Sequence, residues 1–282
     1  MLRLLPLVLL LASAAAAAQA PGTIDKIRKS GTITLGYRVD AVPFSFRGTD
    51  ERPNGFSVDI CQRVVAGLAR SLKLPGLKVN WVAVTSEDRI EQVASGKVDL
   101  ECGTTTVTLG RQAQVDFSLI TFLDGAAFLA RAGGSQPKSG AELPKARVAV
   151  SAGTTTEKEL RRLIADNGTA TEVVTVANHV EGVNLLIDGK VAMYAADRTV
   201  LIGLAMNAGR AAPLQLLDMQ FSYEPYALAM RRDADFRLAV NRVMAEMFRE
   251  REILEIYRKW FGQFGPPAEL LRALYVIQSF RE

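Results

Sequence analysis

The chain contains few of the residues that bind metals or carry redox chemistry. Its 282 residues include one histidine and two cysteines, Cys61 and Cys102. No C-x-x-C pair and no Cys/His cluster occurs, so the sequence predicts neither a metal site nor a bound cofactor. In an oxidising compartment the two cysteines would be able to form a disulfide. Two buried free thiols are equally compatible with the sequence, because spacing does not show whether the Cα atoms come within about 7 Å.

Beyond its first 20 residues the chain has no long apolar run. Residues 1–20 place Arg3 before an apolar stretch and end in the small-residue sequence Ala18-Gln19-Ala20. This layout is that of a secretory signal peptide, and it predicts export with cleavage near Ala20. A membrane anchor is the alternative, but the strongly apolar part is shorter than the roughly 20 residues that span a bilayer.

A strong excess of charge is also missing. The formal net charge is +4, and removal of Arg3 with the signal peptide lowers it to +3. Such a small excess gives no indication of nucleic-acid binding and is compatible with acidic ligands. The sequence also lacks a Gly-rich phosphate loop, a G-x-S-x-G motif and an H-E-x-x-H motif, so it carries no signal for the enzymes that use them.

The mature chain does contain an alternation of strand-like and helix-like segments. This order is typical of α/β architecture with largely parallel sheets. The predicted strands are residues 32–37, 78–84, 98–101, 147–151, 172–176, 191–195 and 226–231. The predicted helices are residues 57–72, 86–95 with Ser86 as N-cap, 156–166, 182–188 and 234–261.

Two breaks in this pattern predict that the chain crosses between two lobes. The Gly- and Pro-containing segment at 133–137 marks the first crossing, and a second is expected near 222–225. We therefore predict a first lobe from residues 21–130 and 225–282 and a second lobe from residues 131–224. Each lobe would be an open α/β sheet, and ligands of such sheets bind at the carboxyl ends of the strands.

Two threonine-rich segments follow predicted strands. ECGTTT at 101–106 places Thr104 and Thr106 on one face, and Arg111 comes five residues later. Hydroxyls, free backbone N–H groups and a guanidinium together suit a carboxylate, although a plain turn with a surface arginine gives the same pattern. SAGTTTE at 151–157 contains Thr154 and Thr155 where a helix would begin. A helix N-terminus attracts anions, and the spacing also fits a capping box.

Four further residues lie at predicted strand or helix ends. Arg38 and Arg89 are candidates for binding an anion, although a lone arginine usually lies on the surface. Asp197 would pair with a ligand ammonium or cap the helix that follows it. His179 falls in a predicted loop, where a single histidine often has no role.

In this order, the segments resemble the polar amino acid-binding proteins of ATP-driven importers, the family 3 solute-binding proteins. The resemblance extends over residues 25–267 and is carried by GTITLG at 31–36, VPFSF at 42–46, GFSVD at 55–59, GKVDL at 96–100 and GKVA at 189–192. Tyr37-Arg38, Thr85-Ser86, Arg89-Ile90, the 101–106 segment, Arg111-Gln112 and His179 are similar to the glutamate/aspartate-binding branch. Cys61, the Tyr226-Ala227 pair and the lead-in at 107–110 depart from that branch.

The resemblance implies a two-lobed periplasmic-binding-protein type II fold, each lobe an open, mostly parallel sheet flanked by helices and joined by two hinge crossings. It implies a periplasmic monomer that hands an acidic amino acid to the permease of an ABC importer. Arg111, Thr104 and Thr106 would hold the α-carboxylate, and Asp197 the ammonium. The distal carboxylate would be surrounded by Arg38, Ser86, Arg89, Thr154, Thr155 and His179.

Other functions are compatible with the same pattern. The ligand could be another polar amino acid or a dicarboxylate without an amine, although Asp197 favours an amine. Some proteins of this fold are dehydratases, and here His179 and Glu224 are the candidate proton donors. The sequence shows no catalytic partner for either residue, so it favours a binding protein over an enzyme. The sensor domain of a receptor is a third alternative.

Overall fold

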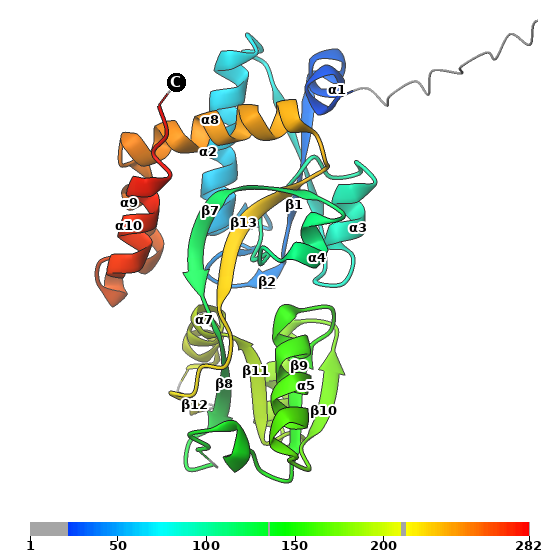
Figure 1. Ribbon diagram of the computed structural model, residues 1–282, viewed down its shortest axis with the longest axis vertical. Coiled ribbons are helices and arrows are strands. Elements are labelled where there is room, and N and C mark those ends of the chain that lie inside the picture. The colour runs from blue at the N-terminus through cyan, green and yellow to red at the C-terminus, as the bar shows by residue number, and fades with distance from the viewer. Residues whose placement is uncertain (1–21, 135, 210–212, 282) are drawn as a thin grey trace, which may run out of the picture.

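The computed structural model describes residues 22–134, 136–209 and 213–281. The predicted signal peptide at 1–20, with its cleavage near Ala20, lies outside these residues. The molecule has two lobes, and each contains one five-stranded sheet with helices packed around it (Figure 1). None of the helices in the described ranges combines the length and the apolar character needed to cross a membrane.

The first sheet has the strand order β5-β1-β6-β13-β7. Strand β1 (Thr32–Tyr37) pairs in parallel with β5 (Lys78–Ala83) and β6 (Leu100–Glu101). Strand β13 (Glu224–Met230) runs antiparallel to β6 and to β7 (Asp116–Asp124). Because β13 is the single strand of opposite direction in this sheet, the prediction of a mostly parallel sheet is confirmed.

Helices and a small three-stranded sheet complete the first lobe. Their bounds are α1 (Thr23–Ser30), β2 (Asp40–Ala41), β3 (Ser45–Arg47), β4 (Pro53–Asn54), α2 (Phe56–Ser71), α3 (Arg89–Ala94), α4 (Leu109–Gln112), α8 (Ala234–Arg249), α9 (Glu252–Phe261), a 3-10 turn (Gly262–Phe264) and α10 (Glu269–Ile277). The prediction of one continuous helix at 234–261 is wrong. Arg251 has φ 62°, in the left-handed region, and this turn of the backbone separates α8 from α9.

The second sheet has the order β10-β9-β11-β8-β12. Strands β10 (Glu172–Val176), β9 (Arg147–Ser151) and β11 (Met193–Asp197) are mutually parallel, and β8 (Ala126–Arg131) is antiparallel to β11 and to β12 (Leu214–Leu216). Around this sheet lie α5 (Thr155–Asn167), α6 (His179–Ile187), α7 (Arg198–Ala208) and a 3-10 turn (Gly140–Glu142).

The chain passes from the first sheet to the second at Gly125, between β7 and β8. A Cβ atom there would lie 2.1 Å from Gln220 Nε2 and 2.5 Å from the Ser222 carbonyl oxygen, so the two passages pack too closely for a side chain. The crossing predicted at 133–137 falls instead after β8, within the second lobe. The return lies between β12 and β13, and the predicted crossing at 222–225 covers the end of this connection and the first two residues of β13. Hinge motion about these passages stays a prediction.

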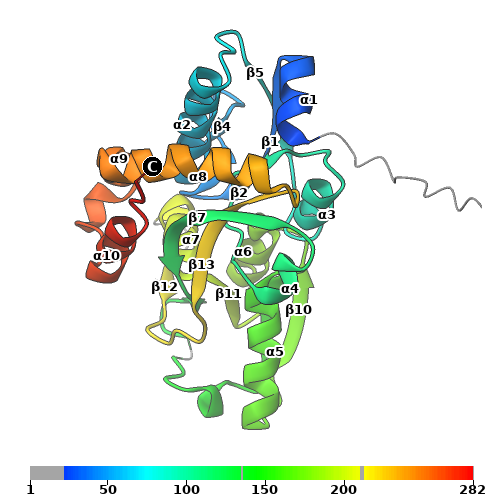
Figure 2. The ribbon, with the colours of Figure 1, turned by 45° about the horizontal axis from the view of Figure 1, so that its top comes forward.

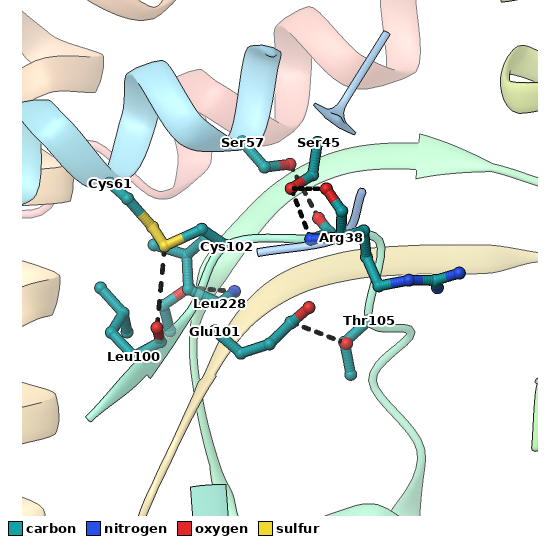
Figure 3. The surroundings of a disulfide bond; sticks show 11 residues. Arg38, Ser45, Ser57, Cys61, Leu100, Glu101, Cys102, Thr105 and Leu228 are labelled. Carbon is teal, nitrogen blue, oxygen red and sulfur yellow. Dashed lines mark hydrogen bonds between the residues drawn. A yellow bond between two sulfur atoms is a disulfide. The ribbon is translucent and has the colours of Figure 1, made fainter. Parts of the chain in front are cut away.

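A disulfide fastens the first lobe next to the site. Cys61 of α2 and Cys102, directly after β6, are joined by an S–S bond of 2.09 Å with the Cα atoms 6.1 Å apart (Figure 3). The structure thus decides between the two states that the sequence left open. One turn earlier in α2, Ser57 Oγ donates to the Gly103 carbonyl oxygen at 2.8 Å. Helix α2 therefore holds the start of the threonine-rich segment in two places.

Candidate functional site

The carboxyl ends of the parallel strands of both sheets face one small cavity. Arg38 follows β1 and the 104–106 segment follows β6, while Ser151 ends β9 and Asp197 ends β11. The cavity between the lobes is lined by Arg38, Arg89, Thr104, Thr106, Ser151, Thr154, Thr155, Thr156, His179, Ala195, Ala196 and Asp197. Eight of the ten predicted binding residues are in this set, all but Ser86 and Arg111. The structure therefore brings them together, and their contacts with a ligand stay predictions.

Ser86 and Arg111 lie immediately beside this cavity. Arg111 of α4 donates from Nη1 to the Thr106 carbonyl oxygen at 2.9 Å and from Nη2 to the Gly153 carbonyl oxygen at 3.4 Å. It thereby contacts both lobes, where α4 lies against the N-terminal end of α5 (Figure 2). Burial lowers the pKa of Arg111, and the nearby carboxylates of Glu224, Glu101 and Asp197 oppose that shift.

Arg89 is a buried cation with unused hydrogen-bond donors. Its side chain is 2% exposed, and neither Nε nor Nη1 has a hydrogen-bond partner among the described residues. Burial, and then the charge of Arg111, lowers the pKa of Arg89 to about 9. The hydroxyl of Ser86, three residues earlier, is likewise buried without a partner. Both groups can bind an anion without first breaking an internal bond.

The local fold explains why the Ser86 hydroxyl is available. The prediction that Ser86 caps the following helix is wrong, because α3 begins at Arg89 with Asp88 in the N-cap position. Thr85 and Asp88 bond reciprocally across the turn, with Thr85 N donating to Asp88 Oδ1 at 2.7 Å and Asp88 N donating to Thr85 Oγ1 at 3.1 Å. This turn shapes the loop and leaves the side chain of Ser86 out of the capping contacts.

Arg38 already has an acidic partner. Its Nη2 lies 3.2 Å from Asp40 Oδ1, and both side chains are buried. The other oxygen of Asp40 accepts a hydrogen bond of 2.6 Å from the backbone N–H of His179, in the second lobe. Arg38 and Asp40 therefore form a charge-balanced link across the cavity. Asp40 was missed from the sequence, although its position two residues after Arg38 is a usable signal.

His179 is the first residue of α6, so its predicted position in a loop is wrong. Its Nδ1 lies 2.7 Å from the Tyr194 hydroxyl, which lies 2.9 Å from Ser151 Oγ. Burial is the main reason that the pKa of His179 falls to about 4. The imidazole is consequently neutral at pH 7, so it offers a ligand one hydrogen-bonding nitrogen and no charge.

Asp197 occupies the N-cap position of α7, but its side chain makes no capping bond. Its carboxylate accepts instead from Thr156 Oγ1 at 2.9 Å and from the Tyr226 hydroxyl. Asp124, at the end of β7, also lies within hydrogen-bonding distance of that hydroxyl, at 3.5 Å. Burial is the main reason that the pKa of Asp197 rises to about 6 and that of Asp124 to about 8.

Asp197 is not the only acid of the site among the described residues. Glu224 and Glu101 are buried near the same arginines, Asp124 lies close to Asp197, and none of the three was predicted as part of the binding set. Within the 101–106 segment, Glu101 Oε2 accepts a hydrogen bond of 2.8 Å from Thr105 Oγ1 (Figure 3). These acids lie at strand ends, at positions that a search of the predicted strand termini for charged residues would have included.

Comparisons with known proteins agree with this architecture. The family model for bacterial extracellular solute-binding proteins, family 3, matches residues 33–263. The L-glutamate/L-aspartate-binding protein of Pseudomonas aeruginosa is 35% identical over 278 residues, covering 95% of this chain and 92% of that protein. The glutamate/aspartate import solute-binding protein of Escherichia coli is 31% identical over 262 residues, covering 92% of this chain and 86% of that one.

Solved structures show the same fold. An ancestral arginine-binding protein bound to arginine matches with a TM-score of 0.75 at 27% identity, covering 82% of this chain and 99% of that one. The expectation of a two-lobed periplasmic-binding-protein type II fold is confirmed by this match together with the two mostly parallel sheets. The family match extends over most of the chain, from β1 to the turn after α9. The chain therefore belongs to the bacterial extracellular solute-binding proteins, family 3.

Proposed function

We propose that this protein is the periplasmic binding component of an ABC importer and captures glutamate or aspartate between its two lobes. The observation that carries the proposal is the buried guanidinium of Arg89, whose Nε and Nη1 lack partners beside the equally unpartnered hydroxyl of Ser86. Leaving buried donors of a charged group unsatisfied is costly, and a ligand carboxylate would supply the missing acceptor. The names of the two relatives reported above support the same ligand class.

The remaining charges divide the cavity into two parts that suit the two ends of such a ligand. Arg111, which contacts both walls of the cavity, would bind the α-carboxylate, and Asp197, which lines the cavity, would bind the ammonium. Arg89, Ser86 and His179 would then surround the distal carboxylate. A neutral amide in that position would leave the positive charge of Arg89 unbalanced, which favours a dicarboxylic ligand.

The proposal is one of binding without chemistry. Of the two candidate proton donors, Glu224 does not line the cavity, and His179 is neutral and hydrogen-bonded to Tyr194. Release of the bound amino acid to a membrane permease, a monomeric state and removal of residues 1–20 complete the proposal. The import function in the name of the Escherichia coli relative supports release to a permease, and the sequence pattern at the N-terminus supports removal of residues 1–20.

Calorimetry of the wild type and of Arg89→Ala tests the ligand. We expect the wild type to bind L-glutamate and L-aspartate more tightly than L-glutamine. Arg89→Ala should weaken binding of the two acids at least about 30-fold, since removing one side of a buried charged contact costs about 2–5 kcal/mol. The loss for L-glutamine should be clearly smaller.

Arg52→Ala is the matched control, because the side chain of Arg52 is 85% exposed and lies outside the cavity. This variant should bind like the wild type. Equal losses for L-glutamate and L-glutamine in Arg89→Ala would remove Arg89 from the distal subsite. A wild type that binds neither acid would overturn the proposed ligand.

A further inference from the structure

Glu224 is a buried carboxylate whose contacts come from both lobes. It is the first residue of β13, it is 1% exposed, and it is absent from the lining of the cavity. Its Oε1 accepts from Ser222 Oγ at 2.6 Å. The same Ser222 hydroxyl accepts from the backbone N–H of Ala126 at 3.0 Å, which connects Glu224 to the outgoing passage after Gly125.

The second oxygen of Glu224 joins the two walls of the cavity. Thr106 Oγ1, from the first lobe, and Thr155 Oγ1, from the first turn of α5 in the second lobe, each donate to Oε2 at 2.6 Å. The two hydroxyl oxygens lie 3.2 Å from each other. Each hydroxyl has one proton, so while these bonds last neither threonine can donate to a ligand carboxylate.

The charge of Glu224 is balanced by a residue that also contacts both lobes. Among the charges that favour the charged form of Arg111, that of Glu224 has the largest effect. Arg111 donates to backbone carbonyls of Thr106 and Gly153, directly beside the two threonines. Glu224 thus lies at the point where the 104–106 segment, the N-terminus of α5 and both passages meet.

We propose that Glu224 is a positioning residue that holds the two lobes together through Thr106 and Thr155, without itself contacting the ligand. Opening the lobes separates Thr155 from Thr106 and breaks at least one charge-assisted hydrogen bond of the pair. The Glu224 cluster, comprising Glu224, Thr106, Thr155 and Ser222, would therefore slow ligand release. The inference rests on the proposed function only in using an amino acid to report release, and its ligand-free test below is independent of it.

Stopped-flow measurement of L-glutamate binding to Glu224→Ala tests this role. We expect the dissociation rate constant to rise at least about tenfold, the size of one hydrogen bond to a charged group, and the association rate constant to stay within about twofold. Glu224→Gln should recover part of the loss, since its amide oxygen can still accept from both threonines. Glu250→Gln, an exposed glutamate of the same lobe, is the control.

A double-variant cycle separates a shared contact from two independent ones. If Glu224 and Thr155 act as one cluster, adding Thr155→Val to Glu224→Ala should raise the dissociation rate constant less than about twofold further. If the two substitutions instead multiplied each other's effects on the dissociation rate constant, the proposal would be overturned. An unchanged dissociation rate constant in Glu224→Ala, or a change confined to the association rate constant, would also overturn it.

The same cycle on urea unfolding needs no ligand. The side chains of Glu224 and Thr155 touch in the folded protein. The double variant should therefore lower the free energy of unfolding by less than the sum of the losses in the two single variants. Independent effects there would contradict the contact. If the wild type does not bind L-glutamate, the proposed ligand is wrong, and the unfolding cycle still decides whether the Glu224 cluster exists.

Discussion

The three arginines of the site differ in how far their charges are already balanced. Arg38 is paired with Asp40, and Arg111 bonds two backbone carbonyls near Glu224. Arg89 alone of the three has buried donors without a partner. All three were candidates from the sequence because of their residue type and their positions at or near predicted strand and helix ends. Their unequal pairing depends on acids that are distant in the chain, such as Glu224 beside Arg111, and could not be predicted.

The carboxyl group of Asp124 shows a second consequence of crowding buried acids. The single proton of the Tyr226 hydroxyl goes to Asp197, and a protonated Asp124 can donate its own proton to the phenol oxygen. Burial, with the charge of Asp197, raises the pKa of Asp124 to about 8. Asp124 is therefore protonated in the folded protein at neutral pH, and ionised in the unfolded chain.

This difference predicts that the free energy of unfolding falls as pH rises. The folded-state pKa of about 8 lies above the unfolded one, so the contribution is complete below pH 4 and is lost as pH rises through 8. Between pH 6.5 and 8.5 we expect a loss of about 2 kcal/mol in urea unfolding. The lowered pKa of His179, about 4, gives an opposite slope that lies below this window.

Asp124→Asn should remove most of that slope, because the amide is a neutral mimic of the protonated acid. Asp218→Asn, at an exposed position, should keep it. A pH dependence in Asp124→Asn equal to that of the wild type would mean that Asp124 is ionised in the folded protein.

At the scale of single elements, the two neighbouring threonines at the N-terminus of α5 make different contacts. Thr154 Oγ1 accepts from the backbone N–H of Glu157 at 3.0 Å, and Glu157 Oε2 accepts from Gly153 N at 3.0 Å. The capping interaction predicted from the 151–157 segment is thus confirmed at Thr154. Thr155, one residue on, turns its hydroxyl to Glu224 instead.

Thr154→Ala should therefore act mainly through stability. Loss of the cap should lower the free energy of unfolding by about 1 kcal/mol, measured in urea. Thr175→Ala, at an exposed position in β10, provides a threonine control without a cap. If Thr154→Ala weakened L-glutamate binding strongly while unfolding like the wild type, the threonine would be a ligand contact rather than a cap.

Local sequence signals located most elements well because propensity and burial agree there. Strands β9 and β10 have the predicted bounds, and α2 differs from its prediction by one residue at each end. The errors occur where long-range contacts decide. A left-handed residue, Arg251, divides the C-terminal helix, and the first passage lies at Gly125, where close packing against residue 220 excludes a side chain. Neither feature has a periodic pattern in the sequence.

At the scale of the whole molecule, strand order determines where the site forms. In each sheet the three neighbouring strands that pair in parallel end at the same edge, and the two edges face each other across the cavity. Alternating α/β segments were enough to predict this arrangement. The disulfide could not be predicted in the same way, because its formation depends on how α2 packs against the first sheet. The disulfide links α2 to the segment that begins at Gly103.

Removing the disulfide should destabilise the whole first lobe. Cys61 and Cys102 are 41 residues apart, and closing a loop of this size lowers the entropy of the unfolded chain by an amount worth about 4 kcal/mol. We expect the double variant Cys61→Ala/Cys102→Ala to unfold in urea with a free energy lower by roughly that amount. Wild-type protein under a reducing agent is the matched control and should show a similar loss. A change below about 1 kcal/mol in both would mean that packing of α2 alone constrains the loop.

Because Cys102 directly precedes the 103–106 segment, L-glutamate affinity should fall together with stability, and an unchanged affinity would show that Ser57 alone holds the segment in place.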